Sequence, residues 1–549
     1  MATILIGLLN GLILARHFEV SSGLLLTLAL VSSLIALLLA RKDALKPLWL
    51  FAFIASATLC FWAYGNIRLA PKPTAFDLEM PRREARLTLE VQTVMRSNKR
   101  YHITNVIARV LHSPRVGRLS KGDLIYARLK LPEQILLTEK SPIILQKGLL
   151  IDATGVLTPI QQTPKSAKQR DFEAYLKNIG VHYQFDRISE LQVIKLPSAF
   201  ARFCADMNNH FQEILRLGAP EDSELANIYV TMLLGKNSAL SKEQSERYRI
   251  TGTMHFFAIS GLHIGVIAAV IAQFLLLIRV PRKWGPWIGL PLLYLYVEII
   301  GASPSAMRAF LMAAFFWSSF AFYRQHSSFA ALSNSAVVVL LFDPDQLWSL
   351  GFQLSYAVVA SILLLGLPIS LFLKQSFQIY QWLPEEEWTT YQRIVSWSLN
   401  KILPLFAISL SAWLASMPLC AAFFNFIAPG AILLNLLLVY LVAIVIINGV
   451  LSIGCATLLL FPVSEFINHA AWLVIFIMDG IVRLGTIVPS IAFPNGTFLP
   501  ELSYAVLVAY FLSLFWLHRR PEKMKTRYIC LPVIVLLGSM GLALSLPEL

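Results

Sequence analysis

Residues 252–265 combine two histidines, a serine and three glycines at the start of a long apolar run. Ionisable and polar groups at membrane depth are costly and usually face protein or a water-filled cavity. Glycine lets helices approach closely or break, which is tolerated where neighbours or water satisfy the freed backbone groups. The segment therefore predicts an internal wall of a membrane protein. Its candidate functional residues are His255, Ser260, Gly261 and His263.

Metal binding and catalysis are alternative roles for the two histidines. His255 and His263 are eight residues apart, so an unbroken helix would not place them on one narrow face. No HxxxH or HxxE spacing accompanies them, which favours hydrogen bonding or pore lining over metal ligation. An embedded enzyme using His255, Ser260 and His263 ranks last, because no third orienting group stands at a suitable spacing. We expect no metal, no cofactor and no enzymatic activity.

Arg308 is the strongest candidate for a functional ionisable residue inside the apolar part of the chain. It follows Ser303 and Pro304, where proline frees a backbone group and small side chains leave room for water. A buried guanidinium is costly unless it is paired or hydrated. Arg308 and Ser303 therefore either line a passage that faces an anion, or Arg308 forms a structural pair with Glu298.

Four further polar residues lie in apolar segments. Gln353 and Ser355 either donate hydrogen bonds to a translocating strand or bridge helices, each bridge contributing about 1 kcal/mol. Bridging is the favoured role for Ser355. Asp479 and Arg483 are spaced i,i+4, so we expect them to neutralise each other on one helix face.

These motifs, in this order, resemble the membrane channel domain of the ComEC family of competence proteins. Residues 233–241 (LLGKNSALS) together with residues 252–265 resemble the entrance to that domain. Residues 301–309 (GASPSAMRA) resemble its small-residue motif ending in arginine, and residues 343–356 resemble its Asp-Pro and Gly-Phe-Gln-Leu-Ser segment. The resemblance weakens after about Leu460. It implies a channel that transports single-stranded DNA into the cytoplasm during natural transformation.

The resemblance also implies partners. Besides single-stranded DNA and membrane lipid, these are an external DNA receptor protein and a cytoplasmic DNA helicase or translocase; a homodimer is left open. Many relatives carry a carboxy-terminal metallo-β-lactamase-like domain marked by a His-x-His-x-Asp-His cluster, which the ten histidines of this chain do not form. No Walker-type loop is visible either. We therefore expect a separate nuclease, and a motor outside this chain.

The composition predicts the elements that must position these residues. Of the 549 residues, 56% are hydrophobic and 14% are charged, whereas soluble proteins carry nearer a quarter of charged residues. Apolar windows of 18 or more residues recur, which predicts a polytopic α-helical membrane protein. The usual basic n-region of a cleaved signal peptide is missing, so the first apolar segment is expected to stay as a membrane helix. About thirteen segments are expected, near residues 4–14, 24–40, 49–63, 254–278, 285–300, 305–323, 329–342, 347–373, 402–424, 431–460, 467–488, 503–517 and 529–546, of which 254–278 or 431–460 could be re-entrant or broken.

A β-rich soluble domain is expected between the third and fourth of these segments. Residues 85–91 alternate apolar and polar side chains with the period of a half-buried strand. Several such runs at close spacing suggest a small barrel or sandwich, and the resemblance implies an OB-like domain. The other runs are residues 101–110, 123–131, 149–157 and 182–185. The expected domains are N-terminal membrane helices (1–70), an extracytoplasmic OB-like β domain with a trailing amphipathic helix (71–223), a helical channel domain (224–500) and C-terminal membrane helices (501–549).

This soluble region is strongly basic. Between Pro81 and Lys130, twelve basic residues stand against three acidic ones, an excess of nine out of the chain's net charge of +14. A phosphate backbone would explain the excess, because cations that displace condensed counterions add salt-sensitive affinity; a solvated basic surface or attraction to anionic lipid explains it equally well. Stacking aromatics, usual at OB-type sites, are limited to Tyr101 and Tyr126. The candidate DNA-binding residues are Arg96, Lys99, Arg100, Arg109, Arg115, Arg118, Lys121 and Arg128.

Basic flanks predict the orientation in the membrane. The short loop of residues 41–46 is basic, which places it in the cytoplasm by the positive-inside rule. With residues 71–223 outside, the basic clusters at 279–283 and 518–527 also fall in the cytoplasm. We therefore expect a bacterial inner-membrane protein with a cytoplasmic amino terminus. A transporter of another anionic solute or polymer on the same scaffold is the alternative, since fold does not fix function.

Overall fold

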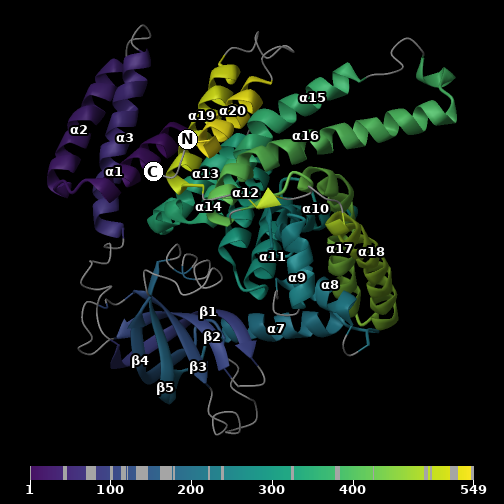
Figure 1. The fold of residues 1–549 in the computed structure, drawn as a ribbon, viewed down its shortest axis with the longest axis horizontal. Coiled ribbons are helices and arrows are strands. Elements are labelled where there is room, and N and C mark those ends of the chain that lie inside the picture. The colour runs from purple at the N-terminus through teal and green to yellow at the C-terminus, as the bar shows by residue number, and fades with distance from the viewer. Residues whose placement is uncertain are drawn as a thin grey trace. The chain divides into compact units, whose positions relative to one another are not determined.

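The computed structural model of the protein has a helical part and a five-stranded barrel (Figure 1). By its internal contacts the chain divides into two compact units. The first unit holds Met1–Phe211, Leu295–Ala302 and Val337–Ser349, and the second holds Gln212–Tyr294, Ser303–Ala336 and Leu350–Leu549. The structure describes residues 2–40, 46–69, 82–98, 103–112, 119, 122–130, 146–160, 173, 176, 180–220, 223–235, 240–322, 327–377, 384–424, 426–487, 493–494, 498–519 and 530–545.

Three apolar helices open the first unit. They are α1 (Ala2–His17), α2 (Ser22–Leu39) and α3 (Lys46–Arg68), and both α1 and α2 pack on α3 (Figure 1). At Gly11 of α1, an added Cβ would lie 2.6 Å from the carbonyl oxygen of Thr58 on α3. Small residues allow this close approach, which is the usual basis of helix packing in membranes.

The β-rich region is a closed barrel. Its strands are β1 (Arg83–Asn98), β2 (Ile103–His112), β3 (Leu124–Lys130), β4 (Leu150–Pro159) and β5 (Val181–Lys195). They follow the order β1-β2-β3-β5-β4, with β4 pairing back to β1; β3 and β5 run parallel and the other pairs run antiparallel. Alternate side chains, such as Leu87, Val106 and Phe185, are fully buried and fill the interior. The predicted β structure is confirmed, since each of the five predicted runs overlaps a strand.

The helices of the second unit carry the polar motifs, and α7, α11 and α13 extend across the division between the units. α17 and α18 form a hairpin in which the two helices lie side by side (Figure 1). The helices in this part of the chain are α7 (Ala199–Leu215), α8 (Glu224–Leu234), α9 (Lys242–Ile250), α10 (Gly261–Leu277), α11 (Gly285–Ile299), α12 (Pro304–Ala321), α13 (Ser328–Phe342), α14 (Leu350–Ser361), α15 (Leu367–Ser376), α16 (Thr390–Phe424), α17 (Ala431–Thr457), α18 (Phe461–Ile487), α19 (Pro500–His518) and α20 (Leu531–Ser545).

Eight helices among the described residues are long and apolar enough to cross a membrane. This confirms a polytopic helical membrane protein. All thirteen predicted segments overlap helices, but several of these helices are short, so the number of crossings stays a prediction. The eight are Ser22–Leu39, Lys46–Arg68, Met254–Leu277, Leu350–Ser376, Thr390–Phe424, Ala431–Thr457, Phe461–Ile487 and Pro500–His518.

Candidate functional site

A polar turn precedes α10. Gly252 has a φ of +71°, and an added Cβ there would lie 3.0 Å from the Cβ of Ala428, so both the backbone conformation and the space favour glycine. A single 3₁₀ turn follows at Met254–Phe256, and Ser260 takes an extended conformation before α10 begins at the next residue. The predicted segment 254–278 is therefore broken, whereas α17 continues unbroken from Ala431 to Thr457.

His263 caps the start of α10. Its side chain is 1% exposed, and its Nδ1 accepts the backbone N–H of Ser260 at 3.4 Å and lies 3.1 Å from the Ser260 hydroxyl. Glutamate or glutamine usually fills this third helical position in a capping box. The Nε2 atom of His263 is buried without a hydrogen-bond partner. This arrangement matches the predicted hydrogen-bonding role.

His255 is placed differently. It is exposed in the 3₁₀ turn, and its Nδ1 lies 3.0 Å from the carbonyl oxygen of Gly252. Within the described residues, no three His, Cys, Asp or Glu side chains gather as a metal site would require. His255 and His263 thus occupy one turn but make separate contacts.

Arg308 is a buried cation on α12. Its side chain is 4% exposed, and its Nη2 donates to the carbonyl oxygen of Gly351 at 2.9 Å and to the hydroxyl of Ser355 at 3.1 Å. Its Nε is buried without a partner. Among the described residues of its own unit Arg308 forms no ion pair. The alternative pair with Glu298, which belongs to the other unit, stays a prediction. A Cβ at Gly351 would lie 3.3 Å from Nη2, so the glycine leaves space for the guanidinium.

The remaining predicted channel residues cap a helix or join two helices. Ser303 is the N-cap of α12, where its hydroxyl accepts the backbone N–H of Ala306 at 3.4 Å. Ser355 connects α14 to α12 through Arg308, as its predicted bridging role requires. The side-chain oxygen of Gln353 accepts the hydroxyl of Tyr504 on α19 at 3.3 Å. The structure therefore brings Arg308 and Ser355 together, and joins Ser260 to His263 separately.

The first half of the motif at residues 343–356 serves the N-terminal helices within the first unit. Arg16 of α1 lies 3.6 Å from the carboxylate of Asp345 and 4.6 Å from the ring centre of Trp348. Tyr64 of α3 donates to the carbonyl oxygen of Leu341 at 2.7 Å. The early residues of this motif therefore hold α1, the carbonyl just before it holds α3, and its later residues hold Arg308.

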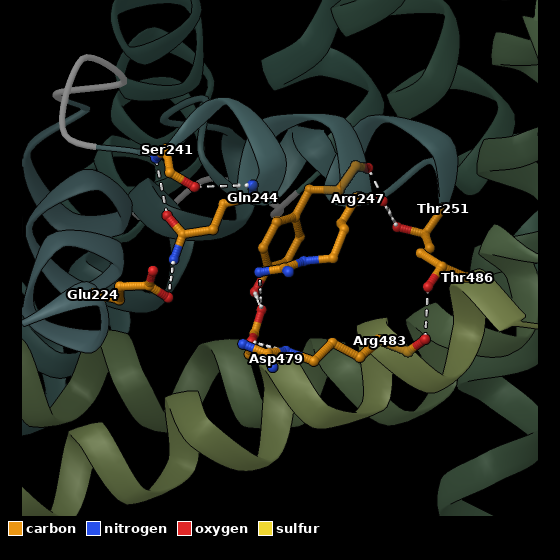
Figure 2. Close-up of polar contacts among 9 residues, drawn as sticks. Glu224, Ser241, Gln244, Arg247, Thr251, Asp479, Arg483 and Thr486 are labelled. Atoms are coloured by element: carbon orange, nitrogen blue, oxygen red, sulfur yellow. Dashed lines mark hydrogen bonds and ion pairs between the residues drawn. The ribbon is translucent and has the colours of Figure 1, made fainter.

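A second buried polar cluster joins α9 to α18. Asp479 of α18 is 5% exposed and lies between Arg247 and Arg483 (Figure 2). Its Oδ2 accepts Arg483 Nε at 2.7 Å, while its Oδ1 accepts the hydroxyl of Tyr248 at 3.3 Å and lies 3.8 Å from Arg247 Nη2. Burial, followed by the Asp479 carboxylate, raises the pKa of the Tyr248 hydroxyl, which therefore stays neutral and donates. The predicted pair of Asp479 and Arg483 is confirmed.

The sequence prediction missed Arg247 and Tyr248. They lie more than 230 residues before Asp479, so no local spacing connects them. The start of their helix was readable, because Ser241 and Gln244 have the spacing of a capping box, and the structure contains that box. Gln244 also donates to the carboxylate of Glu224 on α8 at 3.2 Å (Figure 2).

The predicted DNA-binding cations lie on the barrel, and only some are described. Arg109 on β2 and Arg128 on β3 are exposed on the outer face, because each alternates with buried neighbours. Arg128 lies 5.9 Å from the ring centre of Tyr126. The backbone of Arg96 belongs to β1, but its side chain is outside the description. Outside the described residues lie Lys99, Arg100, Arg115, Arg118 and Lys121.

Tyr126 is not free to stack on a base in this conformation. It is 3% exposed and packs in a small outer cluster with Ile107, Ile160, Leu176 and Val181. The middle of the β2–β3 face is therefore covered, and the two arginines flank it. Any nucleic acid on this face would meet cations and not a stacking platform, apart from Tyr101, which lies outside the described residues.

Comparisons with known proteins agree with these motifs. The family model described as "Competence protein" matches residues 232–520. The chain is 29% identical over 228 residues to ComE operon protein 3 of Bacillus subtilis (strain 168), covering 41% of this chain and 29% of that protein. It is 33% identical over 140 residues to Competence protein ComA of Neisseria gonorrhoeae, covering 24% and 20%, respectively.

A third relative has no functional name. It is an uncharacterized protein of Aquifex aeolicus (strain VF5), 27% identical over 258 residues, which cover 47% of this chain and 54% of that protein. Each of these matches spans less than two thirds of the relative's length. No solved structure matches the chain.

Proposed function

Because the chain belongs to the competence protein family, we propose that it is an inner-membrane channel that passes single-stranded DNA into the cytoplasm during natural transformation. The observation that supports this proposal best is Arg308, a buried guanidinium without a carboxylate partner among the described residues of its own unit. A charge in this state is costly at membrane depth and is usually found on a substrate or ion pathway. A passing phosphate supplies the missing negative charge.

The directions of the helices support a passage whose entrance is lined by helix amino ends. Short connections at residues 278–284 and 300–303 join α10 to α11 and α11 to α12, and short connections favour antiparallel neighbours. α10 and α12, which pack on each other, then run in the same direction. By this inference their amino ends, where Ser260 and Ser303 are the N-caps, lie on the same side. Helix amino ends carry partial positive charge and favour anions.

The barrel is proposed to be an OB-type receiving domain on the extracytoplasmic side. Five strands in a closed barrel, with a parallel pair between β3 and β5, support that assignment. OB-type domains bind oligonucleotides on the face of strands 2 and 3 and with the loop between strands 1 and 2. Arg109 and Arg128 are exposed on that face, and Lys99 and Arg100 belong to that loop in the sequence.

The channel is proposed to work with other proteins and without chemistry of its own. An external DNA receptor delivers the strand, a separate nuclease degrades its complement, and a cytoplasmic helicase or translocase draws it inward. Cations along the passage lower the barrier to a polyanion, and weak, spaced contacts let the strand move on. A homodimer is compatible with this proposal.

The test compares uptake of labelled DNA into the cytoplasm by variants present at equal amounts in the membrane. Arg308→Ala is expected to lower uptake at least about tenfold, equivalent to about 1.4 kcal/mol. Arg308→Lys retains part of the uptake, because lysine keeps the charge but not the planar donor geometry. Ser355→Ala is the matched control, since it removes one contact of Arg308 and leaves the guanidinium in place. Normal uptake by stable Arg308→Ala protein would contradict the pathway role.

A further inference from the structure

α9 is a hydrophilic helix set among apolar ones. Five of its nine residues, KEQSERYRI, are formally charged. An amphipathic helix is held in place mainly by burial of its apolar face, and α9 has almost no such face. Tyr248, 1% exposed, is its large buried side chain. Polar contacts must therefore supply much of what holds α9 in place.

Those contacts fall at two points on α9. At its amino end, Gln244 binds Glu224 of α8. At its carboxyl end, Arg247 reaches the buried carboxylate of Asp479 on α18 (Figure 2). The hydroxyl of Tyr248 donates to the same carboxylate. Hydrogen bonds to a buried charge are stronger than neutral ones. Loss of the carboxylate charge therefore weakens the contacts of Tyr248, Arg247 and Arg483 together.

Tyr248 connects this carboxylate to the polar turn. Its ring meets the ring of Phe257 edge to face, with centroids 4.5 Å apart. Its carbonyl oxygen accepts the backbone N–H of Thr253 at 2.9 Å and the Thr253 hydroxyl at 3.4 Å. Thr253 and Phe257 are fully buried and enclose the 3₁₀ turn that carries His255. Asp479 thus reaches the polar turn before α10 through one intermediate residue, Tyr248.

We propose that Asp479 is a positioning residue of the translocation site, which fixes the polar turn of residues 251–260 through Tyr248. Arg483, on the next turn of α18, holds the carboxylate in the orientation that Tyr248 and Arg247 need. The transport consequence rests on the proposed channel function, but the geometric claim does not. Loss of the Asp479 charge releases the turn without touching any residue in it.

The test measures how fast a small water-soluble maleimide labels Thr253→Cys in solubilised full-length protein. The five native cysteines are first replaced by serine or alanine. Position 253 is fully buried, so labelling is slow in the parent. Asp479→Asn is expected to speed labelling about tenfold, whereas Tyr248→Phe, which removes only the hydroxyl, speeds it less. Glu246→Gln is the matched control, because it breaks an exposed pair with Arg249 on the same helix.

The double variant tests the route through Tyr248. Adding Tyr248→Phe to Asp479→Asn is expected to change the rate less than about twofold, because both changes break one connection. Labelling in Asp479→Asn no faster than in Glu246→Gln overturns the positioning role, whatever transport does. Normal DNA uptake by Asp479→Asn protein with an opened turn, beside lost uptake in Arg308→Ala, also overturns it. Normal uptake in both variants would instead overturn the channel proposal. The labelling rates alone would then decide whether Asp479 positions the turn.

Discussion

At the scale of single residues, Arg308 and Asp479 show opposite ways to keep a charge inside the protein. Asp479 is held by arginines and a tyrosine, whereas Arg308 is held by a carbonyl and a hydroxyl. A neutralised charge fixes structure, and an uncompensated one remains able to attract an anion. The i,i+4 spacing predicted the pair of Asp479 and Arg483, because it lies within one helix. No such rule could reveal Tyr248, since its partner is distant in the chain.

His263 gives a prediction at this scale. His263→Ala should lower the stability of the solubilised protein by about 1 kcal/mol, because the N-cap region of α10 loses its reciprocal contact. His263→Gln should largely keep the stability, since glutamine is a usual residue at this position of a capping box. The midpoint of thermal unfolding measures both, with His255→Ala in the exposed part of the turn as control. Equal losses in the glutamine and alanine variants would argue against the capping role.

At the scale of elements, the barrel shows what alternation encodes and what it does not. Runs such as residues 85–91 predict strands, because one face of each is buried. Closure through β1–β4 and the parallel β3–β5 pair joins segments that are far apart, and their register depends on the whole core. The burial of Tyr126 follows from that closure. The sequence therefore could not show that Tyr126 is unable to stack on a base.

The β2–β3 face gives a prediction for DNA binding. Replacing Arg109 and Arg128 together by glutamine should flatten the dependence of log affinity on log salt by about 1.4, about 0.7 for each phosphate contact to a single strand. Fluorescence anisotropy of a labelled oligonucleotide measures this, using full-length protein in nanodiscs of uncharged lipid. Arg86→Gln is the control, because Arg86 is exposed on the same barrel but paired with Asp152 at 2.8 Å. An unchanged slope in the double variant would favour a merely solvated basic surface.

At the scale of the whole molecule, hydrophobic composition predicted the membrane class, and the helices confirm it. Composition alone fixes neither the number of crossings nor the break before α10, because both depend on how segments pack. Gly252 lies just before the break, and the sequence alone does not show its positive φ or its close approach to Ala428. Orientation is predicted by the basic flanks, which the positive-inside rule assigns to the cytoplasm.

The orientation can be checked with two short epitope tags. A tag at Gly122, an exposed turn with open space around it, should bind antibody on intact spheroplasts. A tag after Lys283, in the basic connection between α10 and α11, should bind only after the membrane is permeabilised. The reverse pattern would place the barrel in the cytoplasm and remove the proposed entrance for DNA.

The most direct measurement of the central claim follows labelled DNA into cells that lack this gene. Receptor, nuclease and motor are left intact, and nuclease-resistant label in the cytoplasm is counted. The account predicts that label collects outside the inner membrane in the deletion strain, and that the unaltered gene restores its entry while Arg308→Ala does not. Entry of the label at the same rate with and without the gene would contradict the account.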